Sequence, residues 1–453
     1  MKKLNLQYVL QLLVILVALA PLTATAQDKE VYLRPSYWKP YDQRGINVYE
    51  TPKAPDTIAY EGMRIRFGAG FTQQFQGLKH ENSFTAPTNT TKLYAMTPGF
   101  NTSMANLNLD VQLADGIRLN LVTYLSTRHH NEAWVKGGYI QFDKLPFKGK
   151  IWDDIMKVTT IKIGHMEVNY GDAHYRRSDG GQTIYNPFIE NYILDAFATE
   201  IGGEITIQKN GLFAVAAVTN GMIKGNIDSL YSTEQDNNIH KSPALYVKGG
   251  WDRQVNEKMR IRIAGSLYHN GSSGGNTLYS GDRAGSNYFM AMEAAKTLDK
   301  ATGAWIANTA AASATSGRLN PGFSKKVDAV QFNGFFKYAG LELFGTYEMA
   351  KGRTKSEVET REFNQLAGDI IYRFGKNENL YVGARYNTAK GQLSGMTTDV
   401  TVDRTAFAAG WFLTRNILLK GEYVTQQYKN FAATDIRNGG KFNGYVIEAV
   451  VGF

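Results

Sequence analysis

The sequence ends with KFNGYVIEAVVGF, residues 441–453, and this stretch decides the fold class. Successive side chains of a β-strand point to opposite faces. From Tyr445 to Phe453 one face is therefore wholly apolar, whereas the other carries Glu448 among small residues. A soluble sandwich could use such a strand, but we expect no later segment to cover the apolar face.

The N-terminus has the pattern of an export signal. Lys2 and Lys3 precede an apolar run at 9–20, and Ala24-Thr25-Ala26 has the small-x-small pattern of a cleavage site. A membrane-spanning helix is the alternative, but the run is shorter than the roughly 20 residues that a span needs. We therefore predict a signal peptide at 1–26. Zero Cys fits export and excludes a disulfide scaffold or a thiolate metal site.

Composition narrows the class without deciding it. The chain has 453 residues and a formal net charge of +9, with 45 Gly, 26 Tyr and 12% aromatic residues. A secreted soluble β-protein has much the same composition. Beyond the signal no apolar run is long enough to cross a bilayer as a helix, so only a β-barrel would let this chain span a membrane.

Alternation of apolar and polar residues recurs along the chain. At 105–113 the odd positions are Ala, Leu, Leu, Val and Leu, and the even positions are Asn, Asn, Asp and Gln. The pattern predicts sixteen strands, each long enough to cross the hydrocarbon when tilted. They are 62–77, 102–114, 116–128, 132–143, 157–170, 197–209, 211–220, 243–254, 258–270, 327–339, 340–351, 362–374, 378–390, 400–414, 415–429 and 440–453.

Short and long connections alternate along the chain, as in bacterial barrels that alternate short periplasmic turns with long outer loops. On the C-terminal side all are short except 144–156, which contains Leu145-Pro146-Phe147 followed by Lys148-Gly149-Lys150. On the other side 78–101, 171–196, 221–242 and 271–326 are long, and 129–131 is short. We predict a 16-stranded antiparallel transmembrane barrel over 62–453, with 14 to 18 strands compatible with the pattern.

Two connecting segments allow more than one interpretation. Residues 27–61 have no sustained period and form either a periplasmic extension or a segment tucked into the barrel. Within 271–326, the Ala-rich stretches 290–296 and 301–315 predict short surface helices. A separate helical domain is the alternative, but this segment is bounded by Gly and Ser and is too small.

If the apolar phase of each strand faces lipid, the opposite phase lines the lumen and its charges set selectivity. Fourteen basic and eight acidic residues fall on that phase, which suggests a mildly electropositive lumen. The bases are Arg64, Arg66, Arg118, Arg128, Lys136, Lys162, Lys248, Arg260, Arg262, Lys337, Arg373, Arg385, Arg404 and Lys420, and the acids are Asp110, Glu200, Glu204, Glu342, Glu348, Asp369, Glu422 and Glu448. The alternative is that these charges pair across neighbouring strands and only solvate the interior.

The loop at 171–196 contains Arg176 and Arg177 beside Asp179. Folded inward, it could narrow the pore and present paired guanidinium groups to carboxylate or phosphate. Folded outward, its arginines would meet lipopolysaccharide or Asp179.

Enzymatic and nucleic-acid functions have less support. His129, His130, His165 and His174 follow no zinc-ligand spacing, and no nucleophile elbow, P-loop or dinucleotide fingerprint stands out. A hydrolase using a Ser and a His at the barrel rim is the remaining enzymatic alternative. The basic charge is dispersed through strands, so we expect no nucleic-acid binding, no cofactor and no metal.

Two resemblances add to this interpretation. The stretch at 441–453 resembles the C-terminal strand of outer-membrane β-barrels, whose terminal Phe, here Phe453 with Tyr445 upstream, marks the barrel for its assembly machinery. Glu132–Val135, Leu145-Pro146-Phe147, Ile161–Gly164 and Tyr170-Gly171 resemble the phosphate-selective porin O/P group, and the Tyr-rich style resembles porin-like proteins of the Bacteroidota. These resemblances imply a trimeric, 16-stranded diffusion channel in a Gram-negative outer membrane.

We predict a passive channel for small hydrophilic solutes, anionic or neutral, with a mild anion preference and no enzymatic activity. The expected partners are outer-membrane lipid, lipopolysaccharide and the barrel assembly machinery, and the expected assembly is a homotrimer. The alternative is a non-conducting barrel that serves as an adhesin or as a partner of an uptake or secretion complex. A fatty-acid-type transporter would want an N-terminal hatch larger than 27–61, and a TonB-dependent receptor needs a far larger plug.

Overall fold

The computed structural model describes residues 38–53, 58–84, 92–126, 133–179, 181–224, 227–281, 284–298, 302–308 and 315–453. The chain divides into two compact units, Met1–Arg34 and Pro35–Phe453. All the described residues belong to the second unit.

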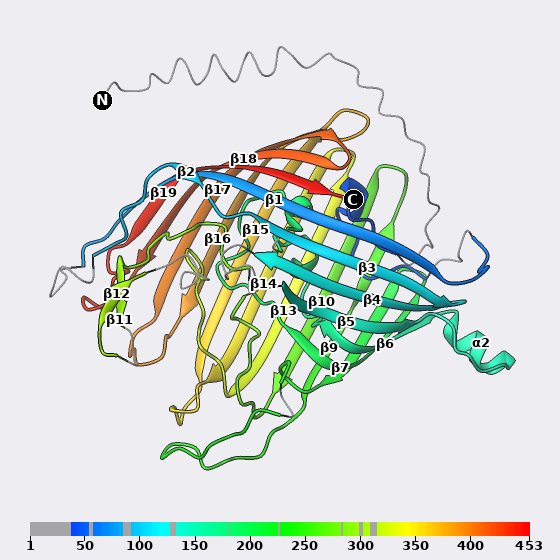
Figure 1. Ribbon diagram of the computed structural model, residues 1–453, viewed down its shortest axis with the longest axis horizontal. Helices are drawn as coiled ribbons and strands as arrows, with labels where there is room; N and C mark the ends of the chain where they lie inside the picture. The colour runs from blue at the N-terminus through cyan, green and yellow to red at the C-terminus, as the bar shows by residue number, and fades with distance from the viewer. Residues whose placement is uncertain are drawn as a thin grey trace. The chain divides into compact units, whose positions relative to one another are not determined.

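The second unit is a closed antiparallel barrel of sixteen strands, which confirms the predicted fold (Figure 1). Each strand pairs with the next along the chain, and β1 pairs with β19 to close the wall. No strand end departs from its predicted position by more than four residues. The strands are β1 (Arg64–Glu81), β3 (Met104–Ala114), β4 (Ile117–Ser126), β5 (Ala133–Phe142), β6 (Thr159–Glu167), β7 (Thr199–Lys209), β8 (Leu212–Thr219), β9 (Ala244–Gln254), β10 (Met259–Asn270), β13 (Lys326–Tyr338), β14 (Leu341–Arg353), β15 (Arg361–Phe374), β16 (Leu380–Gly391), β17 (Val400–Thr414), β18 (Ile417–Lys429) and β19 (Lys441–Gly452).

Alternation fixes which face of each strand turns outward. In β15 buried and exposed residues alternate without a break from Arg361 to Phe374. The exposed positions toward the end of β15 are apolar: Leu366, Ile370, Tyr372 and Phe374 are each about half exposed, whereas Asp369 and Arg373 point inward and are buried. An apolar outer band around a polar interior is the pattern of a transmembrane barrel.

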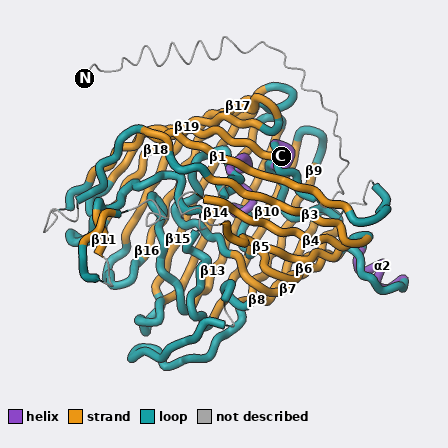
Figure 2. The backbone as a smooth tube through the Cα atoms, in the orientation of Figure 1, coloured by secondary structure: helices purple, strands orange, loops and turns teal. Residues whose placement is uncertain are grey.

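The short connections define one end of the barrel, here called the turn end. Turns such as Asn210-Gly211 join the strands there, and both of these residues have positive φ, as a tight type I′ hairpin requires. The exception is 143–158, which contains the helix α2 (Lys150–Met156); the sequence pattern predicted no helix there. The long connections gather at the opposite, loop end (Figure 2).

The helices predicted in the long loop are not observed among its described residues. Met290 and Met292 have φ of 60° and 61°, which interrupts any helix in the first stretch. In place of helices, β11 (Lys296–Leu298) pairs with β12 (Trp305–Ala307), while 301 and 309–314 lie outside the described residues. In addition to the wall strands, β2 (Gly99–Phe100) pairs with β1. No helix in the described part of the chain is long and apolar enough to cross a membrane.

Candidate functional site in the barrel lumen

The predicted lumen charges that the structure describes lie on the inward phase of the wall, and each contacts a partner within the protein. Most are buried, while about a fifth to a quarter of the side chain is exposed in Arg64, Arg66, Lys162, Arg260 and Lys337. The pairs are Arg64 with Ala59 O, Arg66 with Asp110, Arg118 with Gln141, Arg260 with Asp252, Arg262 with Asp172, Arg373 with Glu342, Arg385 with Asp369, Arg404 with Gln426, Lys420 with Glu448, and Glu422 with Tyr288. Arg128 lies outside the described residues.

The β6–β7 connection, described at 168–179 and 181–198, folds into the lumen and is almost entirely buried. Three of its backbone amides donate to side chains of the opposite wall: Ile189 N to Glu422 at 2.9 Å, Ile193 N to Asn387 at 2.6 Å and Leu194 N to Gln365 at 2.8 Å. The Lys420 ammonium donates to three carbonyls of the same loop, at 2.9–3.1 Å. The loop therefore crosses the barrel from β6 and β7 to β15–β18.

Arg176 and Arg177, the constriction candidates, lie inside the barrel on this loop. The guanidinium of Arg176 is 3.6 Å from the Glu342 carboxylate and lies over the Phe344 ring at 4.9 Å. The guanidinium of Arg177 pairs with Asp195 and lies over the Phe197 ring at 3.9 Å. Both groups are thus positioned in the lumen, and both already have anionic partners there.

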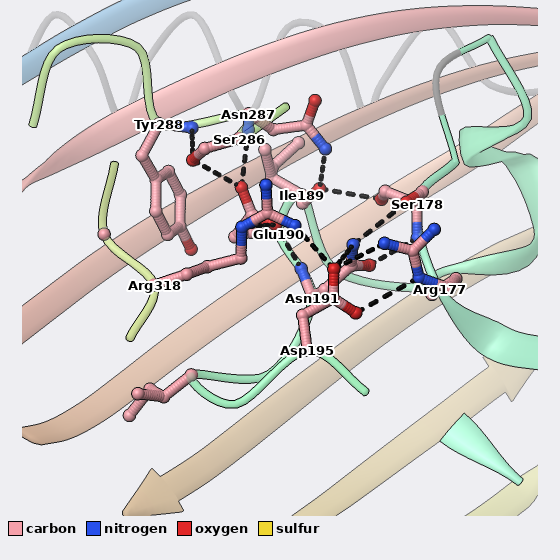
Figure 3. Close-up of polar contacts among 12 residues, drawn as sticks. Arg177, Ser178, Ile189, Glu190, Asn191, Asp195, Ser286, Asn287, Tyr288 and Arg318 are labelled. Atoms are coloured by element: carbon pink, nitrogen blue, oxygen red, sulfur yellow. Dashed lines mark hydrogen bonds and ion pairs between the residues drawn. The ribbon is translucent and has the colours of Figure 1, made fainter. Parts of the chain in front are cut away.

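A second loop, 271–325, meets the first one inside the barrel. Glu190 accepts hydrogen bonds from the Ser286 hydroxyl at 2.7 Å and from the backbone amide of Asn287 (Figure 3). Arg318 of the second loop donates to Asp195 of the first at 2.5 Å. Figure 3 shows these groups converging, so the two loops brace one another across the lumen.

The segment at 38–53 occupies the mouth at the turn end. The hydroxyl of Tyr41 donates to Asp110 at 2.9 Å, and the amide of Asn47 donates to Glu342 at 2.9 Å. The carboxylate of Glu50 pairs with Arg262 at 2.7 Å and with Lys248 at 3.0 Å. Burial alone would favour the protonated form of Glu50, but these two cations hold its pKa at about 2. Hydrogen bonds and ion pairs with charged side chains therefore connect this segment to several separate strands.

A cavity of about 240 Å³ remains between this segment, the β6–β7 loop and the wall formed by β3–β6. Its lining is polar and aromatic, and includes Asn106, Asn108, Lys136, Tyr139, Lys162 and Gln182. The Lys39 ammonium also lines it, 4.2 Å from the centre of the Tyr185 ring. Among the residues that the structure describes, no carboxylate lies within ion-pair distance of Lys39, and burial lowers its pKa to about 8. A cavity of this size accommodates a small solute rather than an oligomer.

Several of these groups could not be found from the sequence. Lys39 and Glu50 lie in a segment without period, and Glu190, Asp195 and Arg318 lie in loops. No local pattern marks them, since their partners are distant in sequence. Within the described ranges no group of three or more His, Cys, Asp or Glu side chains is arranged to hold a metal ion.

A closed 16-stranded barrel with an apolar outer wall, a charged lumen and an inward-folded loop defines the class of outer-membrane porin folds. The anion-selective porin from Comamonas acidovorans has a similar structure, with a TM-score of 0.51 and 9% identity over 86% of this chain and 100% of that one. Outer-membrane expressed OmpT of Vibrio cholerae has a TM-score of 0.49 and 9% identity, covering 87% and 99% of the two chains. The channel DcaP of Acinetobacter baumannii has a TM-score of 0.47 and 9% identity over 87% and 99%.

Comparison by sequence gives no relative: no family model matches the chain, and no curated protein matches it. At 9% identity the structural likeness to the Comamonas porin establishes the fold alone.

Proposed function

We propose that the protein is an outer-membrane channel for passive diffusion of small hydrophilic solutes, with a mild preference for anions and no enzymatic activity. The observation that carries the proposal is the polar cavity of about 240 Å³ inside a barrel whose outer wall is apolar. Water-filled space lined by hydrogen-bonding groups admits hydrophilic solutes, and the inward loops limit their size.

The anion preference rests chiefly on Lys39. The wall cations and the arginines of the β6–β7 loop are paired with carboxylates, which cancels much of their field. The ammonium of Lys39 faces the cavity, and none of the carboxylates that the structure describes lies within ion-pair distance of it. An uncompensated cation beside a narrow aqueous path raises the local concentration of anions. Arg176 and Arg177 then shape the path by holding the loop in place.

Permeability of refolded protein in liposomes tests this function. Swelling should be fast in arabinose, which is small and neutral, and slow in a trisaccharide such as raffinose. Between ions of similar size, gluconate should enter faster than a sugar-derived cation such as glucosamine. Equal swelling in all four solutes would contradict size-limited, anion-preferring diffusion.

A second function, a non-conducting barrel that binds a partner, is favoured by one observation. Three segments enter the lumen, and their charged groups are largely buried in ion pairs. If they close the path completely, the loop end would serve as an adhesin or as part of an uptake complex. A correctly folded barrel without any permeability would decide for this alternative.

The proposal includes the location and the partners. We propose that residues 1–26 are removed during export and that the barrel is assembled through its C-terminal signal. It is then inserted into the outer membrane beside lipopolysaccharide. The side chains of Tyr445 and Phe453 are exposed on the outer wall, where an assembly factor can reach them, and Phe453→Ser should lower the yield of assembled barrel. The porin O/P resemblance adds a homotrimer, which light scattering of the protein in detergent would test.

A further inference from the structure

The long connection at the turn end carries an exposed apolar surface. In 143–158 the side chains of Phe147, Ile151, Trp152 and Ile155 are 59%, 73%, 45% and 43% exposed. Phe147 and Trp152 contact one another, with ring centroids 6.1 Å apart. The other turn-end connections are short turns, so this patch has no counterpart among them.

The patch is one face of an amphipathic helix. At 3.6 residues per turn, Ile151, Trp152, Ile155 and Met156 of α2 share one side, while Lys150, Asp153 and Asp154 share the other. Met156 is buried, whereas the rest of the apolar side is exposed. An amphipathic helix that turns its apolar side away from its own protein requires another apolar medium to cover that side.

The position of α2 identifies that medium. The helix follows β5 and precedes β6, and it projects beyond their ends (Figure 1). The outer wall of the adjoining strands is apolar at Ile140, Ile163, Ile205 and Ile207, which are 39–55% exposed. The helix patch therefore lies next to the surface that already faces acyl chains.

The charges beside the patch fit phospholipid headgroups. Lys148 and Lys150 are exposed just before the helix and at its first residue, and among the described residues neither forms an ion pair with a carboxylate. Lysines beside a Trp-containing apolar face are typical of helices that lie in a membrane interface, where the indole sits at headgroup level.

We propose that α2 is an interfacial anchor: it lies in the lipid leaflet at the turn end, with Phe147, Ile151, Trp152 and Ile155 inserted among phospholipids. The anchor requires the barrel to be in a membrane, which is part of the proposed function, but it does not require conduction. It would fix the depth and tilt of the barrel on the side of β5 and β6.

The absence of Cys from the chain permits a direct test. Single substitutions Ile151→Cys, Asp153→Cys and Ile205→Cys are labelled with an environment-sensitive nitrobenzoxadiazole dye. Each protein is refolded into vesicles of phosphatidylethanolamine and phosphatidylglycerol. Asp153 is the matched control on the polar side of the same helix, and Ile205 on β7 reports whether the barrel itself is inserted.

The anchor predicts that the Ile151→Cys label emits at shorter wavelength than the Asp153→Cys label. A nitroxide near the lipid headgroup should quench the former, and iodide on both sides of the vesicles should quench only the latter. If iodide quenches the Ile151→Cys and Asp153→Cys labels equally while the nitroxide lipid quenches the Ile205→Cys label, the barrel is inserted and the anchor is overturned. Protection of the Ile151→Cys label from both quenchers would overturn it too, in favour of a second copy of the chain as the cover. If the nitroxide lipid does not quench the Ile205→Cys label, the barrel is not in the membrane, and both the proposed membrane location and the anchor are contradicted.

Discussion

At the scale of single residues, Lys39 differs from the other cations of the lumen. Its ammonium lies 4.2 Å from the centre of the Tyr185 ring and 5.7 Å from that of Tyr175, and it lines the cavity. Glu167 and Asp179 stabilise its charged form only partly, so burial still lowers its pKa to about 8. Its charge is therefore both available to a solute and sensitive to pH in the physiological range.

Replacing this lysine should weaken anion preference. In Lys39→Met the reversal potential under a salt gradient should move toward zero, because the uncompensated charge beside the path is lost. Since the wild-type ammonium loses its proton as pH rises through about 8, its anion preference should fall between pH 7 and 9, and that of the variant should stay flat. Lys355→Met, which removes an exposed lysine at the loop end, is the matched control. An unchanged reversal potential in Lys39→Met would show that selectivity arises elsewhere.

Arg177 should matter for stability more than for selectivity. Arg177→Met leaves the buried Asp195 carboxylate with Arg318 as its remaining cation, and breaking a buried pair costs about 3 kcal/mol. Lys144→Met breaks the exposed pair with Asp115 and should cost about 1 kcal/mol or less. Urea unfolding of both variants in lipid measures the difference, and equal losses would show that the Arg177 pair contributes no more than a surface pair.

At the scale of elements, the strands were predictable and the lumen segments were not. The alternation of apolar and polar residues that predicts a strand can be read from neighbouring residues alone, and β15 shows this alternation without interruption. The path of 168–198 depends on partners such as Glu422 and Asn387, which are about two hundred residues away, and no local pattern encodes such contacts. The position of 38–53 in the barrel could not be predicted for the same reason. The helix α2 was missed because seven residues are too few to show a period.

The two inward loops should act as one unit through Glu190. Glu190→Ala removes the carboxylate to which the Ser286 hydroxyl and the Asn287 backbone amide donate, so these two hydrogen bonds between the loops are lost. The loops would then be held together by fewer contacts, among them the Arg318–Asp195 pair, so single-channel recordings should show larger current fluctuations than the wild type. Glu359→Ala, at an exposed glutamate in an outer loop, should leave the current noise unchanged. Identical noise in both variants would contradict the coupling of the loops.

At the scale of the whole molecule, the barrel depends on the seam between β1 and β19. Gly444 on β19 lies opposite Leu78 on β1 and has φ of +146°, and a Cβ there would lie 2.2 Å from the carbonyl oxygen of Gly77. A side chain at this position would therefore push the two strands apart. The wall has no free edge only as long as this seam holds.

Closure should fail in Gly444→Ala and survive in Gly345→Ala, since a Cβ on Gly345 of β14 meets no atom within 4 Å. Folded barrels resist SDS and migrate differently before and after boiling. The Gly444→Ala protein should lose most of its heat-modifiable band, and the Gly345→Ala protein should keep it. Equal folded fractions would show that the seam tolerates a side chain.

The central claim is that this barrel conducts small solutes, and single-channel recording tests it most directly. Mature protein whose folding is verified by heat modifiability is inserted into a planar bilayer under a salt gradient. Stable current steps, with a reversal potential on the anion-selective side, are the predicted result. A folded barrel that inserts and yields no steps would contradict the claim, because the three lumen segments would then close the path.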